Sequence, residues 1–311
     1  MTLFYYDPTF AQHATGDHPE SPQRVLFAAQ HLAETGLLAR VARPSWQAIS
    51  PARLAHTHHP GYLAQLKQFA AAGGGYLDSD TVCSPQSYDI ARQAAGAVAD
   101  AVTRVVAGED RRALCLIRPP GHHALADRAM GFCLLNNIAV GANLALAECN
   151  LDRVLIIDWD VHHGNGTQSI FWENERVGFL SIHRWPFYPG SGRADETGGG
   201  AALGTKVNLP IEFGTSRRDF LDALRSGVER LADKIRPQLV LVSAGFDAHR
   251  NDPIGSLGLE TEDFGPLTQI VRSVADVHAQ GRIVSVLEGG YDLRALADSV
   301  GVHLEELLGT P

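Results

Sequence analysis

The chain has 311 residues, of which 45% are hydrophobic and 20% charged, a composition typical of a globular protein. Lys and Arg number 26 against 35 Asp and Glu, and the net charge of −9 argues against a protein held on nucleic acid by phosphate contacts. The sequence opens without a basic stretch and apolar run, and no apolar run approaches the roughly 20 residues that span a membrane. We therefore expect no signal peptide, no membrane partner and a cytoplasmic location.

Short β-branched or aliphatic runs predict strands, in chain order, at residues 3–6, 113–117, 154–158, 178–183, 206–209, 239–243 and 283–287. Between them, helical patterns lie at residues 23–35, 60–72, 86–107, 138–148, 216–235, 261–279 and 293–308. Runs that are apolar on both faces suit strands buried inside a parallel sheet, and their alternation with helices predicts an α/β fold. No repeat or charged linker interrupts the pattern, so we expect one domain over residues 1–311. The cysteines, Cys83, Cys115, Cys133 and Cys149, form no CxxC pair and are expected to be free thiols.

Polar residues follow four of these predicted strands directly. They are His122 and His123, then Asp158, Asp160 and His162, then Asp247, and finally Glu288 and Tyr291. In open α/β sheets, ligands bind outside the carboxyl ends of the strands. We therefore expect these side chains to meet at one edge of the sheet.

The run DWDVHHGNG predicts a metal site. On an extended segment Asp158, Asp160 and His162 share one face, and their charges would repel one another unless a cation lay between them. Adding Asp247 gives an oxygen and nitrogen set suited to catalytic Zn²⁺, which keeps an open position beside three protein ligands. The alternative to a metal site is a strand end with solvated acidic residues, but that interpretation does not explain the HHGNG that follows.

Two further motifs carry candidate chemistry. The pair His122 and His123 stands behind two prolines that stiffen the turn, and opposite an acidic cluster it becomes a candidate for general acid and base catalysis. Tyr291 follows Glu288 and two glycines, where its phenol could donate to a carbonyl oxygen or only cap the core.

The motifs RPPGHHA, GFCLLNN, DWDVHHGNGT, LSIHR, YPGSG, SAGFDAHRNDP and LEGGY follow one another in the order of the histone deacetylase family. The chain resembles the class II branch of that family, from HPESPQR at residues 18–24 to EGGY. The resemblance implies an arginase/deacetylase-like α/β fold with a central, mainly parallel sheet of eight strands. It also implies a narrow channel for an acylated lysine.

The resemblance assigns roles position by position. Asp160, His162 and Asp247 match the zinc ligands, although the same ligands accept Fe²⁺. His123 matches the general base and acid and His122 the electrostatic histidine, with Asn165 and Asp158 respectively behind them. Tyr291 matches the phenol that polarises the carbonyl. A potassium site is implied at Asp158, Asp160, His162, Ser181 and Ile182.

The remaining matches concern the channel. Phe132 and Tyr188 match the two aromatic walls of the channel. Gly131 matches the residue whose carbonyl lines it, and Asp80 matches the carboxylate at the rim that holds a substrate backbone. Arg24 resembles an arginine at the inner end of the channel, with a helix-surface arginine as the alternative. Tyr188 departs from many relatives, which have Phe there, and Asn165 follows the class II pattern where others have Asp.

The function implied is zinc-dependent hydrolysis of acyl-lysine amides in proteins or peptides. An acetylpolyamine or another small-molecule amide is the alternative, but the position matching the acidic polyamine gate of the family is the apolar Ile254. Residues 65–81 are also short and hold only Asp78 and Asp80. A non-catalytic acyl-lysine-binding module would predict the loss of a ligand or of Tyr291, whereas every matching position is filled.

Overall fold

Eight parallel strands form the central sheet of the computed structural model, which describes residues 2–309. Their spatial order is β2-β1-β5-β10-β9-β6-β7-β8. The strands are β1 (Thr2–Tyr5), β2 (Val41–Ala42), β5 (Arg112–Cys115), β6 (Val154–Asp158), β7 (Val177–Arg184), β8 (Lys206–Ile211), β9 (Leu239–Ala244) and β10 (Ile283–Leu287). A small antiparallel ribbon joins β3 (Gly75–Tyr76) and β4 (Val82–Cys83). The prediction of an arginase/deacetylase-like α/β fold with an eight-stranded parallel sheet is confirmed.

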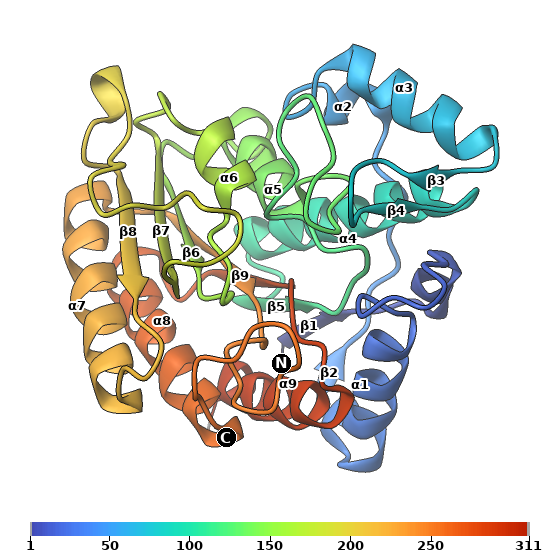
Figure 1. Cartoon of the computed structure of the whole chain (residues 1–311). Coiled ribbons are helices and arrows are strands. Elements are labelled where there is room, and N and C mark those ends of the chain that lie inside the picture. Colours follow the sequence, from blue (N-terminus) through green and yellow to red (C-terminus); the bar gives the residue numbers. More distant parts are fainter. Residues whose placement is uncertain (1, 310–311) are drawn as a thin grey trace.

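Helices cover both faces of the sheet (Figure 1). On one face α1 (Gln23–Glu34), α7 (Arg217–Ile235), α8 (Phe264–His278) and α9 (Leu293–Leu308) pack against one another in the order α1-α9-α8-α7. On the other face lie α4 (Ser87–Ala107) and α5 (Asn137–Ala147), with α3 (Pro60–Ala71) beside α4. The short helices α2 (Pro51–Leu54) and α6 (Asn165–Ile170) complete the set.

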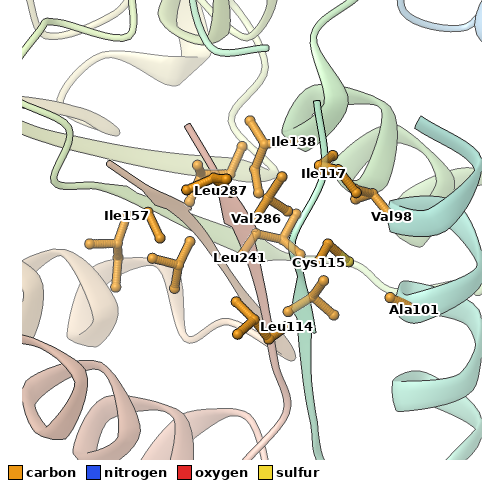
Figure 2. Close-up of a cluster of buried hydrophobic side chains, with 14 of the residues drawn as sticks. Val98, Ala101, Leu114, Cys115, Ile117, Ile138, Ile157, Leu241, Val286 and Leu287 are labelled. Carbon is orange, nitrogen blue, oxygen red and sulfur yellow. The ribbon is translucent and has the colours of Figure 1, made fainter. Parts of the chain in front are cut away.

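The core between sheet and helices follows from the apolar runs of the strands. Every residue of β6, β9 and β10 is buried, because both faces of these strands are covered. Figure 2 shows Val98 and Ala101 of α4 and Ile138 of α5 near Cys115, Leu241 and Val286 of the sheet.

The predicted elements all occur, with ends shifted by a residue or two. The elements that the sequence did not predict, β2, β3, β4, α2 and α6, are too short for a periodic pattern to identify. The predicted helix at 261–279 divides into a 3₁₀ turn, Thr261–Asp263, which begins with a capping box between Glu260 and Asp263, and α8.

The sheet order places a topological switch point at its centre. The chain moves from β5 to β6, but β10 and β9 lie between these two strands in the sheet. A crevice opens outside the carboxyl ends of the strands at such a point, and ligands bind there. The strands β5, β10, β9 and β6 are the ones whose ends carry the predicted site residues.

Two further expectations bear on the chain as a whole. Between residues 2 and 309, no helix is long and apolar enough to cross a membrane. The thiols of the cysteines are all free, with Cys83, Cys115 and Cys133 buried and Cys149 partly exposed.

Candidate active site

Asp160, His162 and Asp247 bring three possible ligand atoms together at the carboxyl edge of the sheet. These atoms all lie within 4.8 Å of one another, and all three residues are buried. His162 Nδ1 lies 3.1 Å from Asp160 Oδ1 and 3.1 Å from Asp247 Oδ2. Ligand atoms about 2.0–2.1 Å from a tetrahedral zinc ion stand about 3.3 Å apart, so the donor set fits zinc in both chemistry and spacing.

The electrostatics of this cluster also favour a cation. Burial raises the pKa of Asp247 to about 7, so its carboxylate is costly without a positive partner. Burial would lower the pKa of His162, but hydrogen bonds to Asp160 and Asp247 raise it to about 9. Two buried carboxylates therefore face one imidazole, and a divalent cation bound there would offset their charge.

Asp158 does not join this cluster, contrary to the prediction that it shares a face with Asp160 and His162. Strand β6 ends at Asp158, and the following residues turn. Asp158 Oδ1 accepts the backbone N–H of Asp160 (3.1 Å), and Asp160 Oδ1 accepts that of His162 (2.9 Å). These local hydrogen bonds replace the two-residue alternation of a strand, and they direct Asp160 and His162 toward Asp247.

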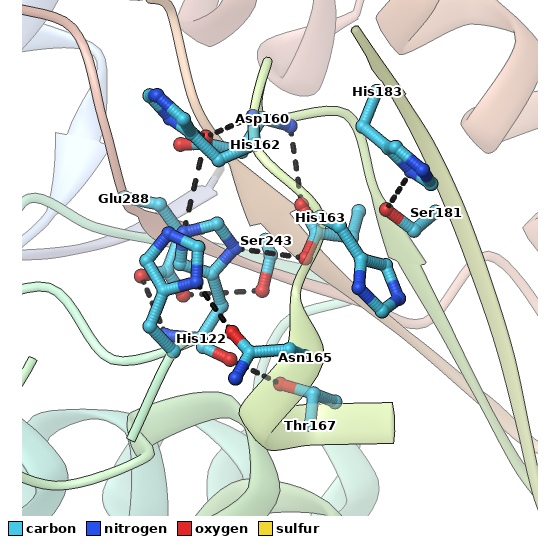
Figure 3. Close-up of polar contacts among 12 residues, drawn as sticks. His122, Asp160, His162, His163, Asn165, Thr167, Ser181, His183, Ser243 and Glu288 are labelled. Atoms are coloured by element: carbon cyan, nitrogen blue, oxygen red, sulfur yellow. Dashed lines mark hydrogen bonds and ion pairs between the residues drawn. The ribbon is translucent and has the colours of Figure 1, made fainter. Parts of the chain in front are cut away.

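The two adjacent histidines have different partners, and Figure 3 shows His122 and Asn165 among the polar groups of the site. His122 Nδ1 lies 3.0 Å from Asp158 Oδ2, whereas His123 Nδ1 lies 2.7 Å from Asn165 Oδ1. The Asn165 amide also donates from Nδ2 to Met130 Sδ (3.4 Å). Because a thioether only accepts, this contact orients the amide oxygen toward His123, which then carries its proton on Nδ1.

Because their surroundings differ, the two imidazole rings have different pKa values. Burial would lower the pKa of His122, but the carboxylates of Asp160 and Asp158 raise it to about 10. Burial and the neighbouring His122 and His162 hold the pKa of His123 well below its ordinary value, and the neutral Asn165 does not reverse this. At neutral pH His122 is therefore an imidazolium and His123 a neutral imidazole.

Glu288, which the sequence placed at the end of a strand without assigning it a role, connects three parts of the site. It is fully buried, and its Oε2 accepts the backbone N–H groups of Gly121 (2.6 Å) and His122 (3.1 Å). Its Oε1 accepts the hydroxyl of Ser243 (3.1 Å). Glu288 thereby connects the end of β10 to the histidine loop after β5 and to β9.

Arg24 lies inside the protein, so the alternative of a helix-surface arginine is wrong. It is fully buried, its guanidinium lies 4.9 Å from the centre of the Tyr291 ring, and its Nε donates to Gly290 O (2.6 Å). The buried Glu20 accepts from Arg24 Nη1 (3.0 Å) and from Arg118 Nε and Nη2 (2.5 and 2.7 Å). One carboxylate therefore holds two arginines, one beside the Tyr291 loop and one at the start of the histidine loop.

A narrow pocket of about 190 Å³ leads to these groups. Pockets for drug-sized ligands have volumes of roughly 300–1,000 Å³, and this pocket is smaller. Its size therefore suits a slender, unbranched ligand chain. Every predicted channel residue except Arg24 lines this pocket. The lining residues are Asp80, His123, Gly131, Phe132, His162, Phe187, Tyr188, Ile254 and Tyr291. Phe187, which the sequence did not single out, stacks on His162 with ring centres 5.2 Å apart.

The wall of this pocket contains a strained segment. Gly131 and Phe132 both have positive φ, 56° and 68°. A Cβ on Gly131 would lie 2.5 Å from His123 Cδ2, so only glycine lets the backbone approach that ring. For Phe132 this conformation costs of order 1–3 kcal/mol, and the Thr81 hydroxyl helps to hold it by accepting the Phe132 N–H (3.1 Å).

Tyr291 closes the inner part of the pocket. Its ring meets Phe132 edge to face, with centres 5.8 Å apart, and Asp252 Oδ2 accepts its backbone N–H (2.7 Å). Burial raises the pKa of the Tyr291 phenol well above its ordinary value although Arg24 opposes the shift. The phenol is therefore protonated at neutral pH and available as a donor.

Of the residues predicted to bind potassium, Asp158, Ser181 and Ile182 lie on two adjacent strands, whereas Asp160 and His162 follow β6 and belong to the metal cluster. Asp158 of β6 pairs with Ser181 of β7, and Ile182 follows in β7. The Ser181 hydroxyl lies 2.9 Å from His183 Nδ1. Potassium binding at Asp158, Ser181 and Ile182 stays a prediction.

The fold and the site together are those of an arginase/deacetylase-like α/β protein, with polar groups from four strands at the switch point. The family model for the histone deacetylase domain matches residues 18–307. The chain therefore belongs to the histone deacetylase family, and it is a hydrolase that acts on amide bonds.

Known relatives agree over almost the whole chain. A histone deacetylase-like amidohydrolase of Pseudomonas aeruginosa is 38% identical over 99% of this chain and 86% of its own. The polyamine deacetylase HDAC10 of Homo sapiens is 38% identical over 99% of this chain, which spans 48% of that protein. The solved HD domain of HDA15 is 35% identical, with a TM-score of 0.93 over 99% of this chain and 88% of that one.

The assignment of the ligands predicts zinc content. Asp247→Ala removes one of three ligand atoms, so the variant should lose most of its zinc on dialysis against a mild chelator, while the native chain keeps about one ion. Atomic emission measures this. Asp252→Asn, a change at a nearby carboxylate outside the cluster, should keep its zinc. Stoichiometric zinc in Asp247→Ala would exclude Asp247 as a ligand.

The role of Glu288 as an acceptor predicts a difference between two variants. Glu288→Gln keeps an oxygen for the two backbone donors and can donate to Ser243, so the free energy of unfolding should change little. Glu288→Ala leaves both N–H groups buried without a partner, at roughly 1–3 kcal/mol each. Urea unfolding of the two variants measures the difference, and equal stability would show that the contact with the histidine loop is dispensable.

Proposed function

We propose that the chain is a zinc-dependent deacylase that hydrolyses the amide of acyl-lysine side chains in peptides or proteins. The observation that carries the proposal is the narrow pocket that places His123 and Tyr291 beside the Asp160, His162 and Asp247 cluster. A neutral histidine, a protonated phenol and a zinc-fitting donor set are the groups that amide hydrolysis requires. Their joint presence argues against a module that only binds acyl-lysine.

The cluster of Asp160, His162 and Asp247 would hold the metal ion. When bound there, zinc supplies Lewis-acid polarisation of a carbonyl and lowers the pKa of water. The fit of the donor spacing supports zinc, and the membership of the chain in a family that is zinc-dependent in general supports it too.

His123 acts as the base and then as the acid. Its Nδ1–H is committed to Asn165, which leaves the Nε2 lone pair free to take a proton from the attacking water. The same nitrogen then returns that proton to the departing amine. His122, charged and held by Asp158, stays an imidazolium throughout and stabilises negative charge that develops nearby.

Tyr291 stabilises the oxygen of the substrate carbonyl. Its protonated hydroxyl donates a hydrogen bond that strengthens as the carbonyl carbon becomes tetrahedral and the oxygen becomes anionic. Arg24 and Asp252 position the ring and the backbone of Tyr291.

The pocket favours an acyl-lysine over an acetylated polyamine. Its lining contains Ile254 and aromatic rings, with Asp80 as the carboxylate outside the catalytic groups. The stem of acyl-lysine is uncharged, whereas a polyamine carries ammonium groups that are costly to bury beside apolar walls. The likeness to a polyamine deacetylase makes the acetylpolyamine the second candidate.

Turnover of matched substrates tests the proposal. An acetyl-lysine peptide should show a higher kcat/KM than an acetylated polyamine, and Tyr291→Phe should lower kcat on the peptide by roughly 10²–10³ while zinc content stays unchanged. A preference for the polyamine would assign the chain to the second candidate. Near-native turnover by Tyr291→Phe would make that residue structural.

The division of labour between the histidines predicts a shift in pH dependence. In Asn165→Asp a carboxylate stands behind His123 and favours its charged form, raising its pKa by about one to three pH units. Because the base must be neutral, the acidic limb of the kcat/KM profile should move to higher pH. Asn165→Ala removes the hydrogen bond without adding charge and should lower the rate with less movement of that limb. A limb that stays in place or moves to lower pH in Asn165→Asp would refute this role of Asn165.

A further inference from the structure

A second and larger hollow, of about 560 Å³, lies beside the catalytic pocket between α3, the segment after β3 and the loop at residues 127–130. We call it the side groove. Apolar and charged residues line it together, and those used below are Phe69, Leu77, Met130, Asp78, Asp127 and Arg128. Apart from Met130, whose sulfur accepts from Asn165 behind His123, none of them has a part in the proposed reaction.

The side groove and the catalytic pocket share their walls. Asp78 lines the groove and Asp80 the pocket, and Asp78 Oδ1 accepts the backbone N–H groups of Asp80 (3.0 Å) and Thr81 (2.7 Å). On the other side, Met130 lines the groove and its neighbour Gly131 lines the pocket. A substrate whose acylated side chain enters the pocket therefore has its adjoining atoms next to the groove.

The chemistry of the groove selects its occupant. Phe69, Leu77 and Met130 are half-buried, so an aliphatic stem laid across them would remove apolar surface from water. Asp78 and Asp127 are exposed, and within residues 2–309 neither forms an ion pair. The edge has a single cation, Arg128, against these two carboxylates. An aliphatic stem with a cationic head matches this surface, and such side chains lie along apolar surfaces in this way.

We propose that the side groove is a subsite for a peptide substrate and binds an arginine or lysine side chain close in sequence to the acyl-lysine. The stem lies on Phe69, Leu77 and Met130, and the cationic head meets Asp78 and Asp127. This inference rests on the proposed function and narrows its substrate class to basic peptides. The net charge of −9 favours the approach of such peptides.

A positional scan tests the subsite. Acetyl-lysine peptides carry Arg, norleucine, Ala or Glu at one position at a time, over the three residues on either side of the acetyl-lysine. At one position Arg should raise kcat/KM about five- to tenfold over Ala, norleucine should give part of that gain, and Glu should lower it.

The variant Asp127→Asn tests the contribution of the cationic head of the substrate side chain separately from that of its aliphatic stem. The Asp127 side chain makes no hydrogen bond or ion pair within the described residues, so the variant keeps the fold. It should reduce the advantage of Arg over norleucine and leave the advantage of norleucine over Ala. Glu175→Gln is the control, because Glu175 is exposed and precedes β7, at the edge of the sheet opposite the active site. It should leave all ratios unchanged.

A minimal acetyl-lysine with blocked termini distinguishes the two levels of the proposal. It reaches only the catalytic pocket, so its turnover should be the same in Asp127→Asn and the native chain. Equal kcat/KM for Arg and Ala at every position would overturn the subsite while the deacylase function stands. Absence of turnover for every acetyl-lysine compound would overturn the function itself. An acetylated polyamine that alone responds to Asp127→Asn would assign the groove to a polyamine and refute the peptide subsite.

Discussion

Buried carboxylates at the carboxyl edge of the sheet organise this protein, because a charge taken out of water must meet hydrogen-bond donors or an opposite charge. Each buried carboxylate is stabilised by a different set of partners. Glu20 takes two guanidinium groups, Glu288 two backbone amides and a hydroxyl, and Asp158 an imidazole. Asp160 and Asp247 converge on His162, and there the remaining negative charge is what a metal ion would neutralise.

The same requirement fixes the loops that carry the reacting groups. Glu288 and Arg118 hold the histidine loop, while Arg24 holds the loop of Tyr291. Glycines give the carboxylates the room they need: a Cβ on Gly289 would lie 2.1 Å from Asp247 Oδ2, and one on Gly245 2.2 Å from Asp160 Oδ2. Positions of these groups therefore depend on contacts among segments far apart in the sequence, and a site held in this way is preorganised for its substrate.

The contrast between the adjacent histidines shows how a neutral neighbour differs from a charged one. His122 and His123 have the same side chain and are both buried, yet Asp158 stands behind one and Asn165 behind the other. Met130 accepts a hydrogen bond that orients Asn165, and Asn165 in turn sets the tautomer of His123. Because Met130 also lines the side groove, the proposed peptide subsite lies next to this pair.

By itself the sequence determined the strands and long helices, since apolar periodicity and turn residues are local signals, and it located the polar residues at the ends of four strands. Tertiary structure alone decided which of these groups meet. Asp158 parts from Asp160 because the chain turns after β6, and Glu288 reaches the histidine loop because β10 lies next to β5 in the sheet. The sequence left open whether Arg24 lies on a helix surface and assigned no role to Glu20, and both residues are fully buried. The order of the strands and the packing of distant segments decide which of these side chains meet. Neither produces a periodic pattern that could be identified in the sequence.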